Sequence, residues 1–304
     1  MNKNDLKGSL FLLSAALIWG SAFVSQSAGM KYVEPYTFNL SRSFVGFLTL
    51  IPVTLFFRKS SCKTNPLTPG EERALNRRSL FAGVICGLLL SAATSFQQVG
   101  ISMTTAGKAG FITALYIIIV PVLGIVFKRK VPRIIWLCAA IALAGFYFLS
   151  VGSDLTLSRG DLLCLVCAFC FSVQIMSIDH FVKNDKKVDP VMLSMVQFLT
   201  VTIVSVFLAF VFEKPSLSGI LSAAFPILYC GVLSSGVAYT LQILGQKHCN
   251  PAVAPLIMSL ESVFAALFGW MILGESMSLK EIFGCLLVLS AVILSQLPSS
   301  GRTG

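Results

Sequence analysis

The stretch AGFITALYIIIVPVLGIVF, residues 109–127, decides the fold class because it contains no charged side chain. A helix needs roughly 20 apolar residues to cross the hydrocarbon core of a bilayer. In lipid the backbone must satisfy its own hydrogen bonds, so such a run is expected to be helical. Similar runs fill most of the chain. We predict an all-α membrane protein with ten transmembrane helices, at residues 8–27, 36–57, 80–101, 107–127, 133–152, 160–181, 190–212, 221–245, 252–273 and 280–297.

The composition excludes an ordinary soluble protein. Of the 304 residues, 56% are hydrophobic and only 12% are charged, whereas a soluble surface needs many more charges. The net charge of +10 would suggest nucleic acid as the partner of a soluble protein. Here the Lys and Arg residues lie mostly in short connections between apolar runs, where they orient membrane helices. We therefore expect the lipid bilayer, and no nucleic acid, as the partner.

The distribution of basic residues predicts the orientation. The connection from Arg58 to Ser79 contains two prolines and six Lys or Arg residues, which is typical of a cytoplasmic loop. Successive connections between the helices lie on alternating sides of the membrane. Counted from this loop, 17 of the 23 basic residues fall on the cytoplasmic side and five on the outer side, and Arg42 lies within a helix. We predict a multi-pass protein of a bacterial inner (plasma) membrane, with both termini cytoplasmic.

The two halves of the sequence resemble each other, which predicts two repeats at residues 1–152 and 153–304. Each repeat would hold five helices, and an odd number inverts the second copy in the membrane, as in many secondary transporters. Some channels share this design, so the repeat alone does not decide the function. The matched positions are Gln97 and Gln242, Gly100 and Gly245, and Tyr116 and Glu261 at a shift of 145, Gly8 and Gly160 at a shift of 152, and Pro35 and Pro190 before the next helix.

Three blocks of sequence resemble the EamA family, a branch of the drug/metabolite transporter superfamily. The blocks are AALIWGSAFV (15–24), QQVGISMTTAGKAGFITALYIIIVPVLG (97–124) and NPAVAPLIMSLESVFAALFGWMILGE (250–275). The family has Glu-Pro after Ser-Leu, whereas Glu261 is followed by Ser262 here, so we expect a straighter ninth helix. The resemblance implies a ten-helix transporter of small metabolites without a cofactor, commonly an exporter of amino acids or related solutes.

Charged residues inside membrane helices are functional candidates because burying them in lipid is costly. Glu261 can carry a proton or contact a cationic group, or it can hydrogen-bond a neighbouring helix break. Arg42, close to Asn39 on the second helix, can bind a solute carboxylate or form a salt bridge or an interface anchor. Lys108 begins the fourth helix, and an interfacial cation is the favoured interpretation.

Neutral polar and aromatic side chains complete the candidate substrate or coupling site. Amides at repeat-related positions can line a shared cavity or bond neighbouring helices, and they are Gln97, Gln98 and Gln242. Aromatic side chains can line the same cavity or simply pack, and they are Trp19, Tyr116 and Tyr239.

The cysteines do not indicate a metal site. Cys164, Cys167 and Cys170 form a CxxCxxC pattern, but it lies inside an apolar helix, where a thiol behaves as a small hydrophobe. We expect no metal, no catalytic residue and no enzyme activity. The favoured function is a secondary carrier of small molecules with possible proton coupling, and the alternatives are a passive channel or facilitator and a multidrug exporter. The oligomeric state is not predicted.

Overall fold

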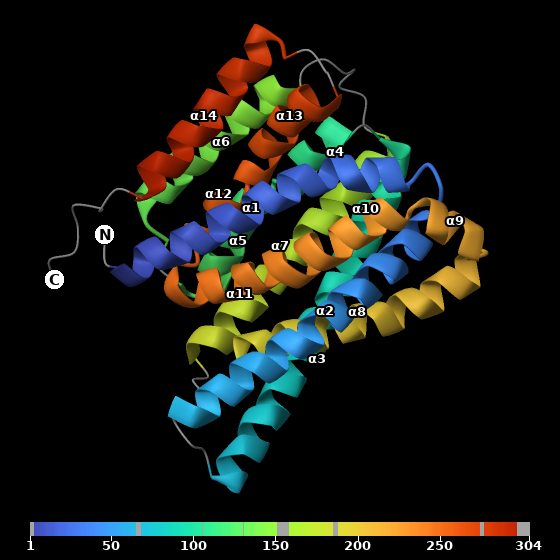
Figure 1. Ribbon diagram of the computed structural model, residues 1–304. Coiled ribbons are helices and arrows are strands. Elements are labelled where there is room, and N and C mark those ends of the chain that lie inside the picture. The colour runs from blue at the N-terminus through green and yellow to red at the C-terminus, as the bar shows by residue number, and fades with distance from the viewer. Residues whose placement is uncertain are drawn as a thin grey trace, which may run out of the picture.

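A computed structural model describes residues 3–64, 68–104, 106–129, 131–150, 158–184, 188–273 and 277–296, and within these ranges every regular element is a helix (Figure 1). The helices of the first half are α1 (Lys3–Gly29), α2 (Pro35–Thr64), α3 (Pro69–Met103), α4 (Ala106–Thr113), α5 (Tyr116–Val126) and α6 (Arg133–Ser150). Those of the second half are α7 (Arg159–Asn184), α8 (Pro190–Phe212), α9 (Leu217–Ser222), α10 (Ala224–Tyr229), the π-helix η1 (Cys230–Ala238), α11 (Tyr239–His248), α12 (Ala254–Met258), α13 (Leu260–Leu273) and α14 (Leu279–Gln296).

Length and apolarity make this chain an all-α, multi-pass membrane protein. Within the described ranges, nine helical stretches are long and apolar enough to cross a bilayer, and a shorter apolar helix covers Arg133–Leu149. Many large apolar side chains are exposed on the outside of the bundle, including Phe207, Phe210 and Leu286. Lipid tails, which solvate apolar surface, suit such an exterior.

The prediction of a long loop from Arg58 to Ser79 is wrong in its extent. Helix α2 continues to Thr64 and α3 begins at Pro69, and the two ends project beyond the rest of the bundle (Figure 1). The basic residues of this region therefore lie mainly on helical extensions.

A capping box explains why α3 begins so early. The N–H of Glu71 donates to Oγ1 of Thr68 at 3.3 Å, and the N–H of Thr68 donates to Oε2 of Glu71 at 3.0 Å. Pro69 occupies the first helical position, where the missing N–H is not needed. Arg58 and Glu72 join the two extensions through an ion pair of 2.6 Å. The signal TPGE is visible in the sequence, but its proline was interpreted as a loop marker.

The helices pack in pairs that join the two halves of the chain. Helix α1 packs against α13, α11 and η1, while α7 packs against α3, α4 and α5. Helix α2 lies against α8 and η1, and α3 lies against α8. Helices α6 and α14 run side by side at one edge of the bundle (Figure 1). The largest group of buried apolar side chains, including Phe146 and Leu256, lies near this edge, and the interior beside it is more polar.

Candidate functional site

A cavity of about 490 Å³ lies at the centre of the bundle, between helices of both halves. Seven of the ten candidate residues predicted from the sequence line it. The full lining consists of Trp19, Phe23, Gln26, Arg42, Gln97, Thr113, Tyr116, Phe171, Ile175, Ser234, Tyr239, Gln242, Met258 and Glu261.

Tyr116 reaches this cavity at a break between α4 and α5. At the break the N–H of Ile117 donates to the carbonyl of Ala114 at 3.0 Å, three residues back instead of four. Such tightened turns redirect a helix. Pro121 lies five residues beyond Tyr116, inside α5, so the interruption precedes it and Tyr116 begins the new helix.

Glu261 lies just after a corresponding break between α12 and α13. The N–H of Ser262 donates to the carbonyl of Ser259 at 3.2 Å, again three residues back. The hydroxyl of Ser259 donates to the carbonyl of Leu256 at 2.8 Å, and such back-bonding by serine favours bending. The segment is therefore interrupted before Glu261 even though the family's proline is absent.

The two residues meet across the cavity. The hydroxyl of Tyr116 donates to Oε1 of Glu261 at 3.2 Å, and Glu261 is only 7% exposed. Within the described part of the chain, Glu261 forms no ion pair. A buried carboxylate without a cation is energetically costly. The cavity therefore favours a proton or a cationic group beside Glu261.

Arg42 contributes the opposite charge and is 4% exposed. Its Nε donates to Oδ1 of Asn39 at 3.0 Å, and its Nη1 donates to Oε1 of Gln26 at 3.2 Å. Asn39 lies behind it and donates to Thr94 and Ser205 at 3.1 and 3.2 Å. Both bonds of Arg42 go to neutral amides, and no ion pair to it occurs among the described residues. A guanidinium held in this way favours an anionic group in the cavity.

The π-helix η1 brings further polar groups to the cavity. The N–H of Tyr239 donates to the carbonyl of Ser234, five residues back, and both residues line the cavity. π-Helical turns are rare and frequently lie at functional sites. A continuous helix was expected at residues 221–245, so the division into α9, α10, η1 and α11 is a correction. Pro226 lies four residues before η1, but no break was predicted from it, and no charged residue lies within residues 221–245.

An aromatic pair forms one wall of the cavity. The rings of Trp19 and Tyr239 lie 4.9 Å apart at 64°, an edge-to-face arrangement that fixes both. Nε1 of Trp19 and Oε1 of Gln242 are buried and have no hydrogen-bond partner in the described part of the protein. Buried polar atoms are normally bonded, so this donor and this acceptor are available to a polar solute.

Three predicted residues do not line the cavity. Asn39 orients Arg42 from behind. Gln98 is fully buried on α3, and both polar atoms of its amide lack a partner among the described residues. The side chain of Lys108 lies outside the described part of the structure.

The lining also includes seven residues that were not predicted. The repeat contained the signal for one of them, because a shift of 152 positions pairs the candidate Trp19 with Phe171. The other six unpredicted residues, for which we find no such signal, are Phe23, Gln26, Thr113, Ile175, Ser234 and Met258.

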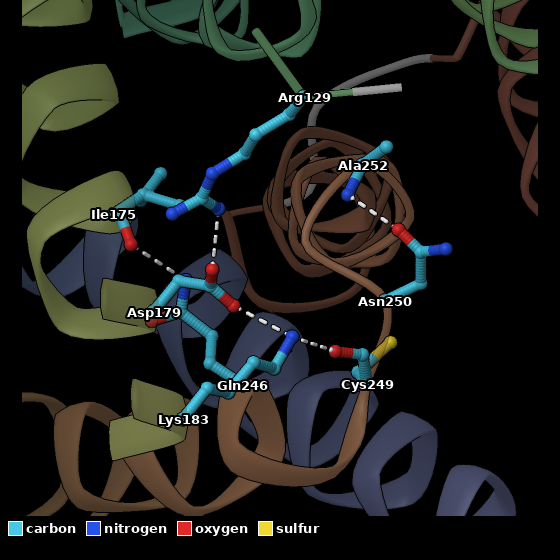
Figure 2. A network of polar contacts seen from close by, with 8 residues as sticks. All are labelled: Arg129, Ile175, Asp179, Lys183, Gln246, Cys249, Asn250 and Ala252. Carbon is cyan, nitrogen blue, oxygen red and sulfur yellow. Dashed lines mark hydrogen bonds and ion pairs between the residues drawn. The ribbon is translucent and has the colours of Figure 1, made fainter. Parts of the chain in front are cut away.

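A network of polar contacts joins the chain near the ends of α5, α7 and α11 (Figure 2). Asp179 accepts from Nη1 of Arg129 at 2.5 Å and pairs with Nζ of Lys183 at 2.6 Å. Nζ of Lys183 also donates to the carbonyl of Cys249 at 2.6 Å. These contacts tie α7 to the chain that follows α5 and to the connection between α11 and α12.

A second cavity of about 390 Å³ lies beside this network and includes Arg129, Asp179 and Asn250 in its lining. Ile175 lines both cavities. Its carbonyl accepts from Nε2 of Gln246 at 3.2 Å (Figure 2). The second cavity is therefore separated from the central one in part by a single side chain of α7.

Sequence comparison identifies the family. A family model of EamA-like transporters matches the chain twice, over residues 6–151 and 158–297. The chain belongs to the EamA-like transporter family. The resemblance predicted from three blocks of the sequence is therefore confirmed.

Similar EamA-like chains occur in archaea and bacteria. The protein is 31% identical to one from Archaeoglobus fulgidus named "Uncharacterized transporter", over 96% of this chain and 86% of that one. It is 21% identical to "Uncharacterized transporter YoaV" of Bacillus subtilis, over 98% and 99% of the two chains. A solved crystal structure of a protein superposes with a TM-score of 0.75 at 16% identity, over 95% of this chain and 96% of the other. At that identity the superposition indicates a shared fold.

Proposed function

We propose that this EamA-like transporter is a secondary carrier of amino acids with apolar side chains, exporting them across the plasma membrane of a bacterium by alternating access. The observation that carries the proposal is a single cavity lined by two buried, opposite charges without ion-pair partners in the described part of the chain. Arg42 would bind the solute carboxylate and Glu261 the ammonium group or, in its absence, a proton. Phe23, Phe171 and Met258 would contact the apolar side chain.

The proposal includes two inverted repeats, residues 1–152 and 153–304, each with five spans. Counting α4 with α5, the helices from α9 to α11 together, and α12 with α13 gives ten spans. The packing of α1 against α11 and α13 has a counterpart in that of α7 against α3 and α5. Such matching contacts support a pseudo-twofold relation, through which the halves exchange conformations.

Close helix contacts support the same relation. A Cβ on Gly8 of α1 would lie 3.0 Å from the carbonyl oxygen of Gly245 on α11. A Cβ on Gly160 of α7 would lie 3.0 Å from the carbonyl oxygen of Gly100 on α3. These four glycines occupy repeat-related positions in the sequence. Small residues at such crossings let helix backbones approach closely in a membrane.

Both termini would face the cytoplasm. The hydroxyl of Ser9 on α1 donates to Oε1 of Gln296 at the end of α14, at 3.1 Å. The first and last helices therefore reach the same end of the bundle. The connections assigned to that end carry most of the Lys and Arg residues, which favours its placement on the cytoplasmic side of the membrane. In this orientation the network around Asp179 closes the cytoplasmic end, and Gln26 and Arg42 lie toward the outside.

Counterflow tests this function. Purified protein in liposomes loaded with unlabelled L-leucine should concentrate external labelled L-leucine transiently, because a carrier exchanges one bound solute for another. Protein-free liposomes are the control. A rate that rises linearly with leucine concentration, without counterflow, would indicate a passive channel instead. Counterflow of a cationic dye such as ethidium but not of leucine would indicate a multidrug exporter.

A further inference from the structure

Arg42 has a neutral counterpart in the second half of the chain. The shift of 155 positions that superimposes Pro35 on Pro190 also superimposes Arg42 on Gln197. Each of the two prolines begins its helix, α2 or α8. Arg42 and Gln197 therefore lie at the same distance from the starts of corresponding helices.

The two residues have similar neighbours. Nη1 of Arg42 donates to Oε1 of Gln26 on α1, at 3.2 Å. Oε1 of Gln197 accepts from Nε2 of Gln174 on α7, at 3.3 Å. When the shift of 152 positions superimposes α1 on α7, Gln26 falls on position 178, which is about one helical turn beyond Gln174. In both halves, the second helix is thus joined to the first through a glutamine amide.

Their surroundings differ in one respect. Arg42 lines the central cavity, whereas Gln197 is 0% exposed and is not part of its lining. Nε2 of Gln197 and Oε1 of Gln174 are buried without a partner among the described residues. When the halves exchange conformations, Gln197 would take the place that Arg42 has now, and Arg42 would withdraw. The unused amide atoms could then bond the solute.

We propose that Arg42 and Gln197 make solute recognition depend on the side of the membrane, with a charged site for carboxylates open to the outside and a neutral amide site open to the cytoplasm. This inference rests on the proposed carrier function. A charge-assisted bond to a carboxylate is about twice as strong as a bond from a neutral amide. The carrier would therefore bind an amino acid more tightly from outside than from the cytoplasm, by about tenfold.

The test uses proteoliposomes in which one orientation is selected by protease or thiol inactivation of the other. Half-saturation concentrations for labelled L-leucine are measured separately at the outer and cytoplasmic faces. We expect the outer value to be about tenfold lower in the parent protein. In Arg42→Gln the two values should approach each other, and in the double variant Arg42→Gln, Gln197→Arg their order should reverse. The carboxylate-free analogue L-leucinol, as competitor, should show no such preference in the parent.

The outcomes separate the two proposals. Leucine counterflow with equal half-saturation concentrations at both faces of the parent would overturn the side-dependent site and leave the carrier function intact. An asymmetry that persists unchanged in Arg42→Gln would also overturn it. Absence of leucine counterflow in the parent would overturn the carrier proposal and this inference with it. If the double variant does not fold, Arg42→Gln and the leucinol competition still decide the question.

Discussion

Replacing Arg42 with glutamine should raise the Kd for L-leucine by about tenfold, because a neutral amide bonds a carboxylate about half as strongly as a guanidinium does. The glutamine amide can still bond Gln26 and Asn39, so the fold should be retained. Isothermal titration calorimetry of the detergent-purified protein measures the loss of affinity. A thermal unfolding curve verifies that the variant is folded.

A matched control is available on the surface of the same helix. Arg58 pairs with Glu72 at a partly exposed site, and such pairs contribute little energy. Arg58→Gln should therefore leave the Kd for leucine within about twofold of the parent value. Equal affinities of the parent protein and Arg42→Gln would show that Arg42 does not contact the solute carboxylate.

Replacing Glu261 with glutamine should remove the dependence of leucine transport on a pH gradient. The amide has nearly the same shape and can still accept a hydrogen bond from Tyr116, but it cannot take up or release a proton. We expect the parent to transport faster when the gradient is imposed, and Glu261→Gln to show the same rate with and without it. Leucine uptake into proteoliposomes, with and without a proton ionophore, measures the effect.

Two further variants show whether the effect belongs to the carboxyl group. Glu281→Gln changes an exposed carboxylate that caps a helix through Ser278, and it should retain the parent's response to pH. Tyr116→Phe removes the hydrogen bond to Glu261 but keeps the carboxyl group, so a response to pH should persist. An undiminished response in Glu261→Gln would contradict proton coupling through this residue.

The sequence predicted the apolar spans well because hydrophobicity and length alone decide which segments enter a bilayer. It was less successful where one backbone hydrogen bond redirects a helix. The breaks before Tyr116 and Glu261 and the π-helix at Ser234 depend on local bonding within apolar runs. Pro255 and Pro226 precede two of these features, but a proline alone does not specify where the backbone bonding changes. The early start of α3 could have been found from Thr68 and Glu71, whose spacing is typical of a capping box.

The candidate site was partly predictable, since polar groups in membrane helices tend to face the interior. This principle found Arg42, Glu261 and Gln242, which all line the cavity. It does not distinguish a lining residue from one buried between helices, and Gln98 belongs to the second kind. Gln197, the neutral counterpart of Arg42 in the other half, was not among the candidates, although the shift of 155 positions from Pro35 to Pro190 aligns the two residues.

Alternating access itself is tested most directly by the accessibility of Ser234, which lines the central cavity. In a cysteine-free chain carrying Ser234→Cys, we predict labelling by a membrane-impermeant methanethiosulfonate reagent from either face, with protection by leucine. Adding Asp179→Asn, which weakens the network at the cytoplasmic end, should raise labelling from the cytoplasm and lower it from outside. If both proteins are labelled from only one face, and leucine does not protect Ser234→Cys, alternating access would be contradicted.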